Sequence, residues 1–205
     1  MKEYLENNSK VEVLSEETLW QKFIEGDEKA LSKIFLSNYE SLYGYASRLI
    51  SNSEEAKDLI QDLFLKLWNN KKSLGRCNQI KFYLLQSVRH LVIDKYKKKT
   101  TSISVEIHEN MLPSELPFDS VLIANQDHEI QMQKLKKSIE RLSKRQQEAI
   151  YLRFYQQIDY PEIASIMVLN VQSVRNLVHS AIQILKSQLG NSMIFFLAFQ
   201  KKVRK

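Results

Sequence analysis

The sequence predicts an all-α protein in which two small helical domains are joined by an irregular acidic linker. Helix-breaking residues are scarce, with four Gly and three Pro among 205 residues. Apolar residues recur at helical spacing through residues 15–99 and again through residues 132–190. Between these parts, residues 100–131 lose that spacing and contain two of the three prolines. We therefore expect a first helical domain, a linker, and a second domain that contains a helix-turn-helix.

Charge is distributed unevenly along the chain. The formal net charge of +6 divides into +3 for residues 1–99, −6 for residues 100–133 and +9 for residues 134–205. A strongly basic last third is typical of a domain that binds a polyanion.

Composition also bounds the cellular setting. The single cysteine, Cys77, excludes an internal disulfide and suits a reducing cytosol. The first ten residues lack the apolar core of a signal peptide. The longest apolar run, Met193–Phe199, is far shorter than the roughly 20 residues of a membrane-spanning helix. We expect a soluble, cytoplasmic protein.

Two amphipathic helices are predicted before residue 51. Ser15 precedes two glutamates and is a candidate N-cap for the first helix, which Gly26 ends. A longer helical region continues to Ile50. The apolar residues at core spacing in these helices are Leu19, Trp20, Phe23, Ile24, Leu31, Ile34, Phe35, Leu42, Ala46 and Leu49.

The next predicted helix, Glu54–Asn69, has two faces of opposite character. Its apolar stripe consists of Ala56, Leu59, Ile60, Leu63, Phe64 and Leu67. The opposite face carries Glu54, Glu55, Asp58 and Asp62. Leu65 projects into this acidic face beside Gln61. A solvated face would explain the acids, but an apolar knob ringed by acids favours docking to a basic partner surface.

A further helix is predicted from Gln79 to Lys99. Its core-facing residues are Phe82, Leu85, Val88, Val92, Ile93 and Tyr96, and its opposite side carries Tyr83, Gln86, His90, Asp94 and Lys97. The helix ends in a basic run that includes Lys95 and Lys97. Such a run suits the helix dipole as a solubilising cap. Aromatic and amide groups beside cations also suit stacking on unpaired bases, and the residues alone leave both interpretations open.

Residues 159–186 are predicted to form a helical hairpin behind a helix that Ser143 caps. Asp159 is a candidate N-cap of its first helix, with Pro161 in the first turn and Glu162 completing a capping box. The second helix has an apolar back that consists of Val171, Val174, Leu177, Val178, Ala181, Ile184 and Leu185. Its front consists of Gln172, Arg175, Asn176, His179, Gln183 and Lys186. Arg pairs with guanine and Gln or Asn with adenine, so a DNA-reading helix is favoured over an ordinary hairpin with a solvated face.

Enzymatic chemistry has little support in the sequence. The four histidines are scattered without metal-ligand spacing, Cys77 has no partner pattern, and no Gly-rich phosphate loop is present. We expect no catalytic residues, no metal, no cofactor and no small-molecule substrate.

Three motifs in order resemble the bacterial RNA polymerase sigma factors of the extracytoplasmic-function type. The first is SNSEEAKDLIQDLFLKLW, which matches that family's E-A-x-D-L-x-Q-(D/E)-x-F-x-x-x-W at Glu55, Ala56, Asp58, Leu59, Gln61, Asp62, Phe64 and Trp68. The second is KFYLLQSVRHLVIDKYKKK, similar to the family's aromatic-rich melting helix. The third, which begins LSKRQQEAIYLRFYQQ and contains the hairpin, is similar to the fourth conserved region. The resemblance covers residues 15–99 and 132–190.

The resemblance implies a role for each of these faces. The docking set, which would bind core RNA polymerase, is Glu55, Asp58, Gln61, Asp62 and Leu65. The residues that would engage the downstream (minus-ten) promoter element and hold the melted strand are Tyr83, Gln86, Arg89, His90, Lys95 and Lys97. The residues that would read the upstream (minus-thirty-five) element are Gln172, Ser173, Arg175, Asn176 and His179. The acidic linker would pass through polymerase channels, and an anti-sigma protein is an implied partner.

Several positions depart from the family's pattern. Val168 stands where Gly is usual in the turn, so the turn is expected to be altered or strained. Ser180 replaces a basic residue, which removes a phosphate contact, and His90 replaces a common Asn. The tail at 191–205 has no match. It is expected to pack on the second domain, to meet an inhibitory partner or to touch a membrane surface.

A free-standing helix-turn-helix regulator is the alternative function. Such a protein would bind duplex DNA by itself, usually at a two-fold symmetric site. A sigma factor would bind DNA weakly alone and would bind promoters specifically with core polymerase.

Overall fold

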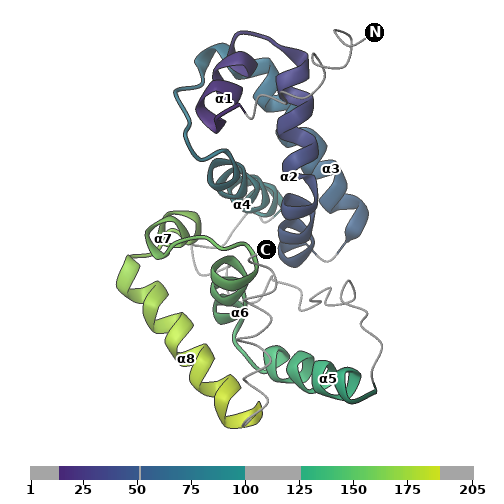
Figure 1. Cartoon of the computed structure of the whole chain (residues 1–205), viewed down its shortest axis with the longest axis vertical. Helices are drawn as coiled ribbons and strands as arrows, with labels where there is room; N and C mark the ends of the chain where they lie inside the picture. Colours follow the sequence, from purple (N-terminus) through teal and green to yellow (C-terminus); the bar gives the residue numbers. More distant parts are fainter. Residues whose placement is uncertain (1–13, 51, 100–125, 190–205) are drawn as a thin grey trace, which may run out of the picture.

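The computed structural model describes residues 14–50, 52–99 and 126–189. Helices account for the regular structure in these ranges, and they form two lobes that lie one above the other (Figure 1). The first lobe contains α1 to α4 and the second contains α5 to α8. The predicted all-α architecture is confirmed. The linker at residues 100–125 and the tail at 191–205 lie outside the described residues.

The first lobe consists of four helices joined by short turns. They are α1 (Glu16–Ile24), α2 (Glu28–Leu49), α3 (Ser53–Asn70) and α4 (Ile80–Lys99), with a 3₁₀ turn at Lys71–Ser73. The N-caps of the first three helices are Ser15, Asp27 and Asn52, each of which accepts a backbone hydrogen bond. The Ser15 cap agrees with the predicted start of the first helix.

A single apolar core holds the first lobe together. The side chains that are almost fully buried in it are Trp20, Phe23, Ile34, Leu42, Tyr45, Ile50, Ile60, Leu84 and Leu85. Trp20 Nε1 donates to the Gly75 carbonyl at 2.9 Å, and the backbone N–H of Ile80 donates to Glu16 Oε2 at 2.8 Å. These two bonds attach α1 to the loop before α4 and satisfy an orphan donor at the start of α4.

The second lobe is built around the helical hairpin. Its helices are α5 (Gln126–Glu140), α6 (Lys144–Ile150), α7 (Tyr160–Met167) and α8 (Val171–Leu189). α5 therefore begins within the residues predicted as linker. Ser143 caps α6 as predicted. Both hydrogen bonds of a capping box between Ser143 and Gln146 are present. The buried Gln147 amide donates to the carbonyls of Ile139 and Leu142, which ties the end of α5 to α6.

One turn of π-helix, Tyr151–Tyr155, follows α6 directly. Its widened i→i+5 geometry includes a bond from the Gln156 N–H to the Tyr151 carbonyl at 3.0 Å. Gln157 then takes φ of 60°, which reverses the chain before α7. The sequence had suggested an ordinary helix over these residues, and the π turn was not predicted.

Val168 retains the left-handed conformation that glycine usually supplies in this turn. It has φ of 55° and ψ of 50°, and its side chain is 67% exposed. The Leu169 N–H still donates to the Ala164 carbonyl at 2.9 Å, so the closing hydrogen bond of the turn is made. The turn is therefore not rebuilt, and the β-branched residue bears an unfavourable backbone conformation.

Candidate nucleic-acid interface

The acidic face of α3 lies on the outside of the first lobe. Its predicted apolar stripe is buried, whereas Asp58, Gln61 and Asp62 are exposed. Leu65 is 60% exposed in the same face. Glu55 differs from the others because its carboxylate lies 3.1 Å from Lys95 Nζ of α4. The structure thus brings the predicted docking set onto one helix face, with Glu55 engaged at its edge.

The residues predicted on α4 do not form one open surface. His90 and Lys97 are exposed. Tyr83 is half-buried, with its ring edge-on to Trp20 at a centroid distance of 5.1 Å. Lys95 is the partner of Glu55.

Gln86 and Arg89, the remaining two, face the second lobe. Gln86 Nε2 donates to Ser165 Oγ of α7 at 2.9 Å. Arg89 Nε donates to Glu148 Oε1 of α6 at 2.9 Å, and these side chains are only 12% and 3% exposed. We call the contact between the lobes the seam. It has three parts: Gln86 with Ser165, Glu148 with both Arg89 and Tyr45, and the polar group around Gln156 described below.

Glu148 is the centre of the first part of the seam. Tyr45 of α2 donates its hydroxyl proton to Glu148 Oε1 at 2.7 Å, beside the bond from Arg89. Burial raises the pKa of Tyr45, and the Glu148 carboxylate raises it further. Burial opposes the charge of Arg89, but the Glu148 carboxylate and the Tyr45 hydroxyl together outweigh that effect and raise the pKa of Arg89. The carboxylate is thus paired with a cation and a neutral hydroxyl donor.

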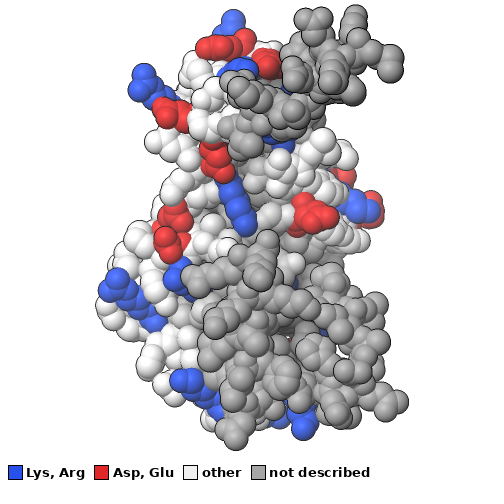
Figure 2. Space-filling view, viewed as in Figure 1, with Lys and Arg blue, Asp and Glu red and all other residues white. Residues whose placement is uncertain are grey.

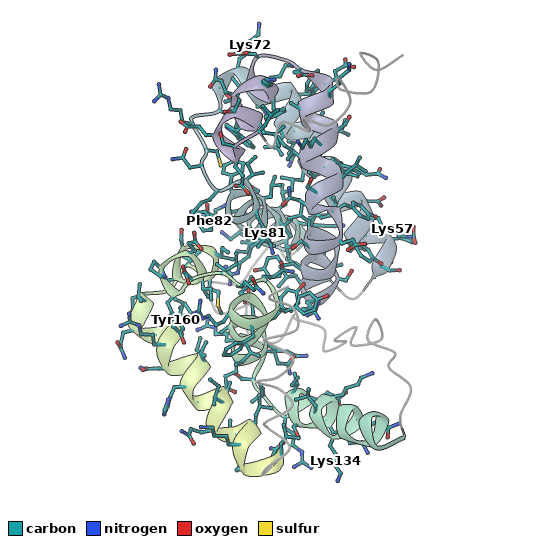
Figure 3. All side chains as sticks on the ribbon, in the orientation of Figure 1. Lys57, Lys72, Lys81, Phe82, Lys134 and Tyr160 are labelled. Carbon is teal, nitrogen blue, oxygen red and sulfur yellow. The ribbon has the colours of Figure 1, made fainter. Side chains whose placement is uncertain are left out.

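A second polar group lies farther along the seam. Gln156 Nε2 donates to the Ser41 carbonyl at 3.2 Å and to Tyr151 Oη at 2.6 Å, while the Ser41 hydroxyl donates to Gln156 Oε1. Lys81 Nζ donates to the Gln156 carbonyl at 3.0 Å. Figure 3 shows Lys81 and Phe82 at the side of α4 that faces the second lobe.

Arg48 completes the seam through aromatic contacts. Its guanidinium carbon lies 3.6 Å from the Tyr151 ring centroid and 5.6 Å from that of Tyr155. These two rings come from the π turn and stack on each other at 4.9 Å. Burial lowers the pKa of Arg48. Within the described ranges, Arg48 Nε finds no hydrogen-bond acceptor.

Sequence reasoning missed the seam residues Tyr45, Arg48, Glu148 and Gln156. The available signal was their position, because Tyr45, Arg48 and Glu148 lie at core-facing positions of their helices and Gln156 is buried just after the π turn. Buried polar groups require partners, and a partner was not evident within the same lobe.

The reading face of α8 is open, as its pattern predicted. Val174, Val178, Ala181 and Leu185 are buried against the lobe. The exposed side chains of the front are Gln172, Arg175, Asn176, His179, Gln183 and Lys186. Ser173 is half-buried, and its backbone N–H donates to Asn170 Oδ1 at 2.7 Å, which makes Asn170 a helix cap that sequence analysis missed.

The polar groups of this face are partly preorganised. Gln172 Nε2 donates to Asn176 Oδ1 at 3.0 Å, so two amides one turn apart share an orientation. Ser180 accepts from Gln146 Nε2 at 3.0 Å and ties α8 to α6. No Asp or Glu occurs in α8. The edge of the molecule that α8 forms accordingly shows blue and no red atoms in Figure 2.

Tyr160 lies at the start of α7, beside α8 (Figure 3). The guanidinium carbons of Arg153 and Arg175 lie 4.8 Å and 5.8 Å from its ring centroid. Arg153 also donates to Asp159 Oδ1 at 2.7 Å, and the Asp159 N–H donates to Glu162 Oε2 at 3.2 Å. The second of these bonds is half of the predicted capping box.

In the parts of the chain that the structure describes, no group of three or more His, Cys, Asp or Glu side chains is arranged to hold a metal ion. None of the helices traced at 14–50, 52–99 and 126–189 combines the length and apolar character needed to cross a bilayer.

Both lobes are similar to known protein families. Residues 34–101 match the family described as sigma-70 region 2, and residues 132–185 match sigma-70 region 4. The RNA polymerase sigma factor YlaC of Bacillus subtilis is 24% identical over 163 residues, which cover 80% of this chain and 94% of that protein. The ECF RNA polymerase sigma factor SigW of the same organism is 23% identical over 175 residues, with 80% and 91% covered.

Two solved structures share the fold. CnrH in complex with the cytosolic domain of CnrY has a TM-score of 0.57 at 16% identity, with 86% of this chain and 97% of that chain covered. The sigma factor RpoE in complex with the anti-sigma factor NepR, from Bartonella quintana, has a TM-score of 0.55 at 24% identity, with 78% and 97% covered.

Proposed function

Because the chain is an RNA polymerase sigma factor of the extracytoplasmic-function type, a member of the sigma-70 family, we propose that it directs core polymerase to specific promoters and assists strand opening. The observation that carries this proposal is the presence of both sigma-70 regions, in order, on one chain. The faces found on α3, α4 and α8 then receive distinct roles.

The acidic face of α3 is the proposed polymerase-binding surface. Asp58, Gln61 and Asp62 are exposed around Leu65, so an exposed apolar side chain is surrounded by polar and negatively charged ones. A basic partner surface would be steered by the charges and would gain apolar contact from the Leu65 side chain. This arrangement supports the roles of the docking set that the sequence predicts.

The front of α8 is the proposed reader of the upstream element. Arg175 is exposed and free of acidic neighbours on its helix, so its guanidinium is available for bidentate pairing with a guanine. Gln172 and Asn176 supply amides of the kind that pair with adenine. Ser173 and His179 flank them and complete the predicted set.

α4 is the proposed binding surface for the downstream element. His90 and Lys97 are exposed and lie two turns apart, where a base edge and a phosphate could be met together. Tyr83, Gln86, Arg89 and Lys95 are engaged in protein contacts in this structure. Gln86 and Arg89 contact the second lobe, so their predicted DNA contacts require a rearrangement.

An anti-sigma protein is a proposed partner. Two structures of the same fold were solved as complexes, one with CnrY and one with the anti-sigma factor NepR.

We propose that this chain acts in the cytoplasm as a regulatory subunit without catalytic residues of its own. The alternative of a stand-alone helix-turn-helix regulator is not favoured, because its first lobe would have no reason to match sigma-70 region 2.

The test compares DNA binding with and without core polymerase. The purified chain, core polymerase and their mixture are each incubated with fragmented genomic DNA from the source organism, and the retained fragments are sequenced. We expect specific enrichment only in the mixture. Equal enrichment of two-fold symmetric sites by the chain alone would establish the regulator instead.

A further inference from the structure

Two amide side chains on the front of α8 are bonded to each other. Gln172 Nε2 donates to Asn176 Oδ1 at 3.0 Å, and both side chains are exposed. Residues four apart on a helix are neighbours, so the bond bridges one turn along the outer surface, and on an ordinary surface helix it would only stabilise the helix slightly. Here it lies on the face that is proposed to read the upstream element, where the orientation of an amide decides which base it can pair with.

The backbone beneath this pair is fixed at the start of α8. Asn170 Oδ1 accepts from the Ser173 N–H at 2.7 Å, and the Asn170 carbonyl accepts from the Val174 N–H at 3.2 Å. The Val174 side chain is fully buried against the lobe. Gln172 therefore extends from a capped and anchored turn, and the bond to Asn176 restrains the remaining freedom of its side chain.

The bond leaves the two amides with different free groups. A Gln or Asn side chain has two N–H donors and a carbonyl oxygen that can accept twice. Gln172 gives one N–H to the bond and retains the other N–H beside its carbonyl oxygen, whereas the oxygen of Asn176 is already directed at Gln172. An N–H beside a carbonyl oxygen is the combination that pairs with N7 and N6 of adenine. Gln172 has that combination free, and Asn176 does not.

The neighbouring side chains of α8 have partners elsewhere. The guanidinium carbon of Arg175 lies 5.8 Å from the Tyr160 ring centroid of α7, and Ser180 accepts from Gln146 of α6. By helical spacing these two contacts lie on either side of the amide pair. No Asp or Glu occurs in α8 that could accept from Gln172 instead.

We propose that Gln172 reads one adenine of the upstream element and that Asn176 is its positioning residue, so that the two amides act as one reader of one base pair. The inference rests on the proposed function and deepens it, because it replaces two separate amide contacts with a single one. A Gln172 amide that is oriented before DNA arrives pays a smaller entropic cost when it pairs with the base. The bond to Asn176 also strengthens once the base pair excludes water from it.

The restraint on Gln172 is measurable without polymerase or DNA. Nuclear magnetic resonance relaxation of the side-chain amide nitrogens gives their order parameters in the purified full chain. Gln183 is the internal reference, because it is exposed on the same face and has no side-chain hydrogen bond within the described ranges. We expect a higher order parameter for Gln172 than for Gln183, and we expect Asn176→Ala to lower the Gln172 value to that of Gln183. Equal values in the unaltered chain overturn the proposal.

Promoters randomised over the upstream element and transcribed by core polymerase test the reading role. Gln172→Ala is expected to reduce the preference for adenine at one base pair by roughly tenfold or more, since a bidentate contact is lost. Asn176→Ala is expected to weaken the same preference by about two- to fivefold, because the contact remains but is no longer held. Within the Gln172→Ala background, Asn176→Ala should cause no further loss at that base pair. Gln188→Ala removes an exposed amide of α8 outside the front and should leave the preference unchanged.

Asn176→Asp separates positioning from direct reading. Asp keeps an oxygen that accepts from Gln172 Nε2, but it has no N–H with which to contact a base. Its negative charge near the phosphates should weaken binding to every sequence alike, so transcription falls while the preference for adenine is retained. Loss of the preference in Asn176→Asp would show that Asn176 contacts the base itself and would overturn the proposal.

Three further results would also overturn it. They are losses at different base pairs in Gln172→Ala and Asn176→Ala, additive losses in the double variant, and a larger loss in Asn176→Ala than in Gln172→Ala. Both side chains are exposed and Ala favours a helix, so circular dichroism should show each variant folded. If the unaltered chain selects no promoters with core polymerase, the proposed function fails instead, while the order parameters still decide whether Asn176 holds Gln172.

Discussion

Arg89 and Glu148 form a buried ion pair, at 2.9 Å, between helices α4 and α6 of different lobes. The pair joins the helix assigned to strand melting to the domain that carries the reading helix. Removal of one member of a buried pair normally leaves an uncompensated charge. The pair therefore ties the two lobes to each other in this structure.

Charge reversal on α3 should abolish polymerase capture. Asp58→Lys with Asp62→Lys replaces attraction by repulsion at the proposed docking face, and we expect the affinity for core polymerase to fall by roughly 100-fold or more. Both side chains are exposed, so the melting temperature should change little. Co-elution with core polymerase measures the effect. Glu40→Lys on α2 serves as a control, and survival of capture in the double variant would refute the docking assignment.

Leu65 should contribute to capture but not to folding. Its side chain is 60% exposed, so Leu65→Ala is expected to change the free energy of unfolding by less than about 0.5 kcal/mol. If Leu65 fills a pocket of the partner, the same change should cost about 1–2 kcal/mol of binding free energy. Titration calorimetry with core polymerase measures the second quantity. Leu36→Ala, at another exposed Leu, provides the control.

Arg175→Ala should relax promoter discrimination. Loss of a bidentate base contact costs about 1–3 kcal/mol at one position of the upstream element. Competition transcription between promoters that differ at that position measures the difference. A uniform loss across all promoters would show that Arg175 contacts a phosphate.

Val168→Gly should stabilise the second lobe. Gly adopts φ of 55° without the steric cost that a β-branched residue bears, although its greater freedom in the unfolded chain offsets part of the gain. We expect a net increase of about 0.5–1 kcal/mol in the free energy of unfolding, measured by urea denaturation. Gln183→Gly, within α8, should instead lower the free energy of unfolding by about 1 kcal/mol. A destabilised Val168→Gly would show that the Val168 side chain makes a compensating contact.

Alkaline pH should weaken the structure through Tyr151. Burial raises the pKa of Tyr151 to about 12, against the opposing influence of the Arg48 guanidinium and of the hydrogen bond from Gln156. Its unfolded pKa is about 10, so the stabilising contribution is complete below about pH 10 and is lost as pH rises toward about 12. The full contribution is about 2–3 kcal/mol. Tyr151→Phe should lose less free energy of unfolding than the unaltered chain between about pH 9 and about pH 11.

The sequence predicted the structure correctly where the informative pattern lies within a single helix. The buried stripe of α3 and the two faces of α8 follow from helical spacing, and the predicted exposure of Leu65 and Arg175 is confirmed. The Ser143 cap is confirmed for the same reason, because all of its partners lie within three residues. The assigned binding roles of these faces and the domain limits stay predictions.

Relationships between distant residues could not be predicted. Tyr45 and Glu148 are 103 positions apart, and nothing in either helix indicates that the two core-facing polar groups meet. Arg89 and Gln86 were expected to face a nucleic acid, but their partners in this structure come from the second lobe. The π turn at Tyr151–Tyr155 was likewise not predicted, and its two tyrosine rings lie beside Arg48 of the first lobe.

The central claim is that this chain supplies promoter selection to core polymerase. In vitro transcription of fragmented genomic DNA, with start sites mapped by sequencing, tests it most directly. The account predicts a set of start sites that require the chain, share two upstream sequence elements, and disappear with Asp58→Lys/Asp62→Lys. Start sites that are identical with and without the chain would contradict it.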